Sequence, residues 1–74
     1  MNNKVRYLIE GITKDIVTYL MQDNGMSMPE AIGLFHNSET FEKLSDPQTG
    51  LYIEGSAYVY EILKTELKMG KIIF

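Results

Sequence analysis

Apolar residues recur at helical spacing over the first third of the chain, from Lys4 to Gln22. At 100° per residue they fall within an arc of about 120°, the width of a stripe that faces a core. We therefore predict one long helix, ended by Asn24-Gly25 because either residue tolerates the left-handed backbone that closes helices. The stripe consists of Val5, Leu8, Ile9, Ile12, Ile16, Tyr19 and Leu20.

The same helix carries a second, smaller apolar group away from that stripe. Val17 and Met21 lie one turn apart on the back of the predicted helix, with Tyr7 nearby. Single apolar residues are ordinary on protein surfaces, so a purely structural interpretation is available. The alternative, which we retain, is an exposed seam that another chain can cover.

Two short helices are predicted next, at residues 27–37 and 38–44. Ser27 and Glu30 have the spacing of a capping box, in which each side chain bonds to the backbone of the other residue. Ser38 is expected to cap the second of these helices in a similar way. The expected inward-facing residues are Ile32, Phe35, Phe41 and Leu44, with Ala31 and Leu34 beside them.

The stretch "DPQTGLYIE" that follows resembles an ion-binding loop at first sight. A calcium loop needs several oxygen ligands at alternating positions, and the carboxylates here are too few. A turn explains the stretch better, because Asp46 can accept hydrogen bonds from the backbone N–H groups just ahead of it and Gly50 can take a positive φ. Leu51 and Ile53 are then expected to face the core.

The last helix is predicted from Ala57 to about Met69, with Ser56 as its N-cap and Gly70 as its end. Its apolar arc covers about 200°, which is wider than a helix needs to cover one core. The helix is therefore either buried centrally or packed on two sides, and the second side can belong to another chain. The arc comprises Val59, Ile62, Leu63, Leu67 and Met69, with Tyr58 and Tyr60 on its edges.

Glu66 falls near the centre of that apolar arc. A carboxylate there must reach solvent, find a cation or hydroxyl, or raise its pKa. Three interpretations stay open: a solvated residue where the bundle opens, a partnered residue at a subunit contact, and a catalytic acid. The sequence places no second carboxylate or histidine beside it.

The helices together predict an all-α fold, a compact bundle of about four helices with one long, two short and one of medium length. Residues 1–74 are enough for a single small domain. Only "LYI" and "KIIF" have β character, and they could pair as a minor two-stranded element.

Cysteine is absent and His36 is the only histidine, which excludes disulfides and any site that needs thiolates or several imidazoles from one chain. His36 falls at a predicted helix end, where a positive charge suits the helix dipole. The serines fall at caps and turns, and nothing resembles a catalytic triad. We therefore predict no catalytic residue, no metal site and no cofactor, and we do not expect an enzyme.

The net charge is −3 at pH 7, and eight of the acidic residues lie between Asp15 and Glu61, where Lys43 is the only base. Nucleic-acid binders gain affinity from Lys and Arg on phosphates, so we expect no nucleic-acid partner and favour a basic partner if charge selects one.

No apolar run approaches the roughly 20 residues of a membrane span, and the N-terminus lacks signal-peptide features. We expect a cytoplasmic protein that does not enter a membrane.

Four short motifs occur together in this chain: an S-x-x-E-A helix start, an N-S-x-T/E-x-x-x-L segment, a D-x-x-T-G-L-Y turn and a Y-V-Y-E-x-L helix. In these motifs the chain resembles a group of short, uncharacterised bacterial proteins with a domain of unknown function, and the resemblance covers roughly Asp15 to Leu67. Such proteins are sometimes encoded beside toxin-like genes. The resemblance implies an antitoxin-type or adaptor role, and it implies no catalytic residues.

These observations lead to the hypothesis of a non-enzymatic protein-interaction module, either homodimeric or bound to another protein. The alternative is a small-molecule-binding or regulatory domain with a pocket between the last helix and the "TGLY" turn, lined by Tyr52 and Tyr58. The candidate interaction surface comprises Tyr58, Tyr60, Leu67, Glu66, Val17, Met21 and Tyr52.

Overall fold

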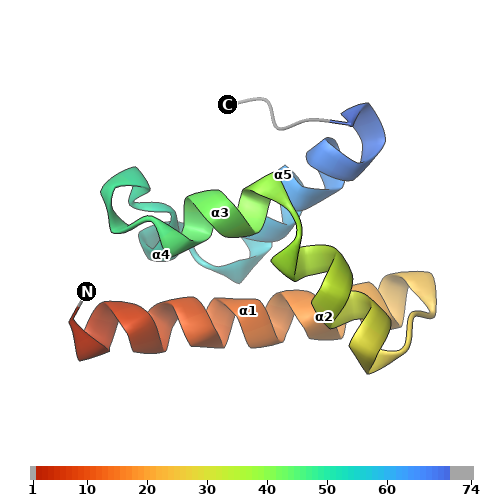
Figure 1. Cartoon of the computed structure of the whole chain (residues 1–74), viewed down its shortest axis with the longest axis horizontal. Coiled ribbons are helices and arrows are strands. Elements are labelled where there is room, and N and C mark those ends of the chain that lie inside the picture. Colours follow the sequence, from red (N-terminus) through yellow and green to blue (C-terminus); the bar gives the residue numbers. More distant parts are fainter. Residues whose placement is uncertain (1, 71–74) are drawn as a thin grey trace.

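Helix α1, Asn3–Asn24, is the longest element of the computed structural model, which describes residues 2–70 (Figure 1). The side chain of Asn2 caps its start by accepting a hydrogen bond from the Val5 N–H at 2.8 Å. Gly25 ends it with φ at 66° and donates its N–H to the Met21 carbonyl. The predicted long helix and its stop are confirmed.

Helices α2, Met28–His36, and α3, Glu39–Ser45, also lie where their capping signals predict them. At α2 both bonds of the capping box are formed, from the Glu30 N–H to Ser27 Oγ at 3.3 Å and from the Ser27 N–H to Glu30 Oε1 at 3.1 Å. At α3 the Ser38 hydroxyl accepts from the Phe41 N–H at 3.0 Å and donates to the Phe35 carbonyl at 2.6 Å. The second bond joins the two helices.

The segment after α3 contains a 3₁₀ turn, η1, at Pro47–Thr49 and the one-turn helix α4, Leu51–Glu54. Asp46 Oδ1 accepts from the Gln48 N–H at 3.0 Å, and Gly50 has φ at 67°, which confirms the predicted turn.

The predicted β character of "LYI" is wrong, because these residues form α4. Residues two apart lie about 200° apart around a helix, so Leu51 and Ile53 point to opposite sides. Leu51 is 3% exposed and Ile53 is 71% exposed, against the expectation that both face the core. The other half of the predicted β element, "KIIF", lies outside the described residues.

Helix α5, Ser56–Met69, ends as predicted at Gly70, whose φ is 79°. Its start differs from the prediction, because Ser56 is the first helical residue and Gly55 precedes it without a side-chain cap. The Ser56 hydroxyl donates instead to Asp15 Oδ2 on α1, at 2.6 Å. The Ser56 side chain, which was expected to cap its own helix, therefore links α5 to α1.

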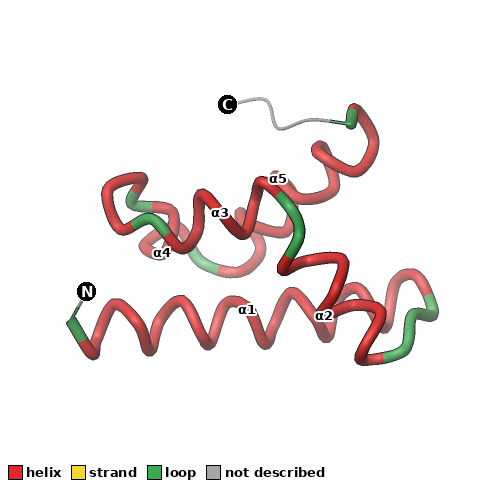
Figure 2. The backbone as a smooth tube through the Cα atoms, in the orientation of Figure 1, coloured by secondary structure: helices red, strands yellow, loops and turns green. Residues whose placement is uncertain are grey.

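The five α-helices are arranged around α1, which packs against each of the other four. Figure 1 shows α2 turning back across the C-terminal part of α1. Helices α3, α4 and α5 lie together above α1 in this view. Figure 2 shows how short the connections between the helices are. The all-α bundle is confirmed, with α4 as one helix more than predicted. Within residues 2–70, no helix combines the length and apolar character needed to cross a membrane.

Every α-helix contributes at least one residue to a single cluster of buried apolar side chains. Val17, predicted to face outward, belongs to this cluster at 8% exposure, because α2 packs beside α1 on the Val17 side. Leu8 and Ile32, predicted to face inward, are exposed. The largest fully buried side chains are Phe35, Ile16, Leu20, Leu44, Leu63, Val59 and Thr40.

The contrast between two isoleucines tests this core. Ile16 is fully buried and Ile53 is largely exposed. We expect Ile16→Ala to lower the free energy of unfolding by about 3 kcal/mol, since it removes buried methyl groups and leaves a cavity. Ile53→Ala is the matched control, with an expected loss within about 0.5 kcal/mol. Urea denaturation measures both values, and equal losses would contradict the burial pattern.

Candidate functional site

The seven residues of the predicted interaction surface differ widely in exposure. Of these seven, Tyr58 and Leu67 are the exposed ones, both on α5. Tyr60 and Val17 are buried, and the remaining three, Met21, Tyr52 and Glu66, are partly buried. The structure therefore divides the predicted set between surface and interior.

Tyr60 holds α5 against the C-terminal part of α1. Its hydroxyl donates to Asp23 Oδ2 at 2.8 Å, and its ring packs on Tyr19 with centroids 5.0 Å apart. The ammonium of Lys64 lies 5.1 Å from the ring centroid. Burial raises the pKa of the Tyr60 hydroxyl to about 12, and the hydrogen bond and charge of Asp23 act in the same direction. Tyr60 thus stabilises the interior.

Glu66 reaches from α5 to the N-terminus of α3. Its Oε2 accepts from the Glu39 N–H at 2.9 Å, while Oε1 accepts from the Thr40 N–H at 2.9 Å and the Thr40 hydroxyl at 2.7 Å. Partial burial opposes ionisation of the carboxyl, but these three hydrogen bonds outweigh it and lower its pKa. Its partners therefore lie within its own chain, 26 and 27 residues away.

The proposed tyrosine pocket at the "TGLY" turn has no counterpart among the four surface hollows identified within residues 2–70. Tyr52 is partly buried and Tyr58 is half exposed, and neither lines any of the four. The largest of these hollows lies elsewhere, between α1 and α2.

This α1–α2 groove has a volume of about 680 Å³ and the most apolar lining of the four hollows. Two of its lining residues are Val17 and Met21, the pair predicted as an exposed seam. Because α2 runs beside them, the pair forms the inner part of a groove and is only partly accessible. The apolar side chains that line the groove are Tyr7, Val17, Met21, Met28 and Ile32.

Three of these apolar side chains are open to solvent: Tyr7 is 74% exposed, Met28 is 55% exposed and Ile32 is 38% exposed. Met28 was not predicted to lie at a surface, and Ile32 was predicted to face the core. Their signal was available, since Met28, Ile32 and His36 recur four residues apart and so share one edge of α2.

Charged groups flank the apolar lining along α1. Glu10 lies 3.5 Å from Arg6 Nε in an exposed i,i+4 pair. Lys14, one turn further on, makes no salt bridge within residues 2–70. Between them lies Gly11, where an added Cβ would meet no atom within 4 Å.

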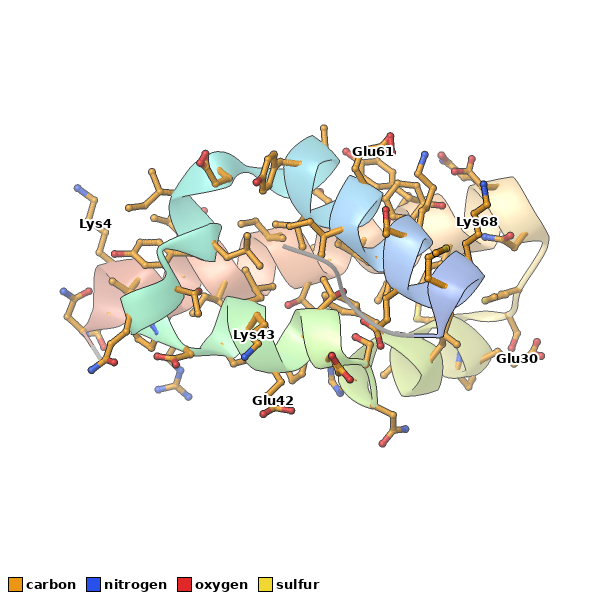
Figure 3. All side chains as sticks on the ribbon, turned by 90° about the horizontal axis from the view of Figure 1, so that it is seen from above. Lys4, Glu30, Glu42, Lys43, Glu61 and Lys68 are labelled. Atoms are coloured by element: carbon orange, nitrogen blue, oxygen red, sulfur yellow. The ribbon has the colours of Figure 1, made fainter. Side chains whose placement is uncertain are left out.

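Figure 3 shows Lys4, Glu30 and Glu42 extending outward from the bundle. At the far end of the groove, His36 stacks on Phe41 with ring centroids 4.6 Å apart. Within residues 2–70, no three His, Asp or Glu side chains gather where they could hold a metal ion. The α1–α2 groove, which is open, mostly apolar and flanked by a few charges, is suited to binding a surface of another molecule.

Glu66→Gln tests the link between α5 and α3. We expect it to lower the free energy of unfolding by about 2 kcal/mol at pH 7, because a charged acceptor of backbone N–H groups is lost. The lowered pKa means that the contribution is present above pH 4.5, the ordinary value, and fades as pH falls below it. Urea denaturation across this range measures the difference. Glu61→Gln is the matched control, and an equal loss there would contradict the assignment.

Tyr60→Phe tests the link between α5 and α1. The raised pKa favours the neutral hydroxyl in the folded protein, so its contribution is present below pH 10 and is lost as pH rises through about 12. We expect Tyr60→Phe to cost about 1 kcal/mol at pH 7 and to flatten this alkaline loss. Urea midpoints between pH 8 and 12 give both values. Tyr58→Phe is the control, and an unchanged alkaline loss in Tyr60→Phe would refute the assignment.

Comparison of the chain with family models, with curated proteins and with solved structures found no match. The geometry of residues 2–70 is therefore the basis for a functional proposal, and its most distinctive surface feature is the α1–α2 groove.

Proposed function

We propose that this protein is a non-enzymatic interaction module that binds a helix in the α1–α2 groove. The observation that carries the proposal is the open apolar lining, in which Tyr7, Met28 and Ile32 are exposed beside the more buried Val17 and Met21. Contiguous exposed apolar surface in a small protein is typical of a contact site.

The dimensions of the groove suit a helical ligand. On α1 the lining extends from Tyr7 to Met21, which is about 21 Å at 1.5 Å per residue, or roughly four helical turns. A helix in a groove is a recurrent binding mode, with anchors at i, i+3 or i+4, and i+7. Methionines such as Met21 and Met28 adapt their shape to different partners, which suits a contact surface.

An adaptor or antitoxin-type role in the cytoplasm is consistent with this mode of binding. It is the role implied by the resemblance to short bacterial proteins encoded beside toxin-like genes, and such a role requires a protein partner and no catalytic group. A homodimer and a complex with another protein are both compatible with the groove.

A synthetic amphipathic helix with leucines at i, i+3, i+4 and i+7 is a direct probe of the groove. We expect the unlabelled peptide to shift the backbone amide NMR signals of Gly11, Lys14 and Ile32 in dilute labelled protein. Ile32→Glu should weaken binding at least about tenfold, because it puts a charge against the apolar face of the peptide.

The matched control is Ile53→Glu, which makes the same change at an exposed residue on α4, outside the groove. Thermal melts of both variants show whether they remain folded. Peptide binding that both variants reduce equally, or that shifts signals only outside the groove, would refute the proposed site.

A further inference from the structure

We infer that the helix bound in the groove is α1 of a second copy of this chain, packed antiparallel about a two-fold axis near residue 12. This inference rests on the proposed use of the groove as a helix-binding site. A two-fold contact uses the same surface on both copies, so that surface must be complementary to itself. The groove face of α1 meets this requirement in its charges, its aromatic anchor and its glycine.

The charges on this face are complementary to their own copy. Glu10 and Lys14 lie two residues on either side of position 12, so an antiparallel neighbour places each opposite the other. Two Glu10–Lys14 pairs then form across the axis, and Lys14 gains the salt bridge that it lacks within residues 2–70. Complementary charges of this kind select the register of a contact.

Neighbouring registers bring like charges together. An axis near residue 14 would oppose the two copies of Lys14, and an axis near residue 10 would oppose the two copies of Glu10. Like charges facing each other across an interface disfavour it. The charge pattern therefore favours one antiparallel register over those one turn away on either side.

The same axis gives the exposed tyrosine an apolar site. Tyr7 and Val17 also share position 12 as their midpoint, so Tyr7 of one copy lies opposite Val17 of the other. Met21, Met28 and Ile32 line the same groove as Val17. A tyrosine buries a large apolar ring there while its hydroxyl stays at the wet edge, and methionine sulfur makes favourable contacts with aromatic rings.

Gly11 supplies the close approach of the two helices. Glycine is a poor residue for the interior of a helix, and nothing within the described chain requires it here, since an added Cβ would meet no atom within 4 Å. The axis near residue 12 places Gly11 beside the crossing point. The distance between two packed helices depends on the side chains at the contact, so a glycine there lets the backbones come closer.

Sedimentation equilibrium of the full chain, with charge-swap variants, tests the register. We expect a wild-type dimer that weakens as salt increases, and about a tenfold higher dissociation constant for either Glu10→Lys or Lys14→Glu. The double variant Glu10→Lys/Lys14→Glu restores opposite charges across the axis, so we expect it to recover most of the wild-type affinity. Failure of the double variant to recover would overturn the register.

Gly11 variants separate an interface role from a folding role. At dilution to monomer, Gly11→Ala should raise the Tm by about 5 °C, because alanine is the better helix former. Gly11→Gln should raise the dissociation constant of the dimer at least about tenfold, because its side chain holds the helices apart. Greater helix stability with weaker association is the expected combination, and unchanged association in Gly11→Gln would count against the crossing point.

Two outcomes would distinguish this inference from the proposed function. A chain that stays monomeric at about 1 mM while the synthetic helix still binds the groove would overturn the second copy as the occupant and leave the groove as a site for another protein. A dimer whose affinity is unaffected by Gly11→Gln, Ile32→Glu and both charge reversals would use another surface. That result would also overturn the inference.

Discussion

The hydrogen bonds between the Glu66 carboxylate and the N-terminus of α3 hold the second half of this protein together. Helix α3 has seven residues, too few to be stable alone, and its first N–H groups need acceptors. Glu66 satisfies those of Glu39 and Thr40, while Ser38 satisfies that of Phe41. With its start fixed in this way, α3 can bury Thr40 and Leu44 against the rest of the core.

Helix α1 supports the remainder of the bundle and also forms one wall of the α1–α2 groove. Every other α-helix packs against α1, and one side of α1 carries the apolar stripe, most of which lies in or against the core. The other side combines Tyr7, Gly11 and Met21 with a wall of α2 that stays open to solvent. A chain of 74 residues buries only a modest fraction of its apolar surface on folding. A partner that covers the apolar side chains left exposed would add to that buried area. The core and the proposed contact surface thus share one helix.

Most boundaries of α1, α2 and α3, and the end of α5, were predictable because their signals lie within a few residues of the helix ends. The capping box of Ser27 and Glu30, the Ser38 cap and the glycines at 25 and 70 act on backbone groups at most four positions away. Periodicity likewise placed most of the α1 stripe in the core. For the candidate site, the sequence predicted the apolar group of Tyr7, Val17 and Met21 but assigned it to an open surface.

Contacts between distant residues decided the rest. The role of Glu66 depends on its hydrogen bonds to Thr40, 26 residues away in the sequence. The Ser56 hydroxyl donates to Asp15, 41 residues away, and does not cap its own helix. Val17 became buried, and the groove acquired its second wall, only because α2 folds back beside α1. Capping and periodicity are properties of neighbouring residues and can be read along the chain. Which side chains meet across helices depends on how the helices pack, and the tertiary structure alone specifies that arrangement.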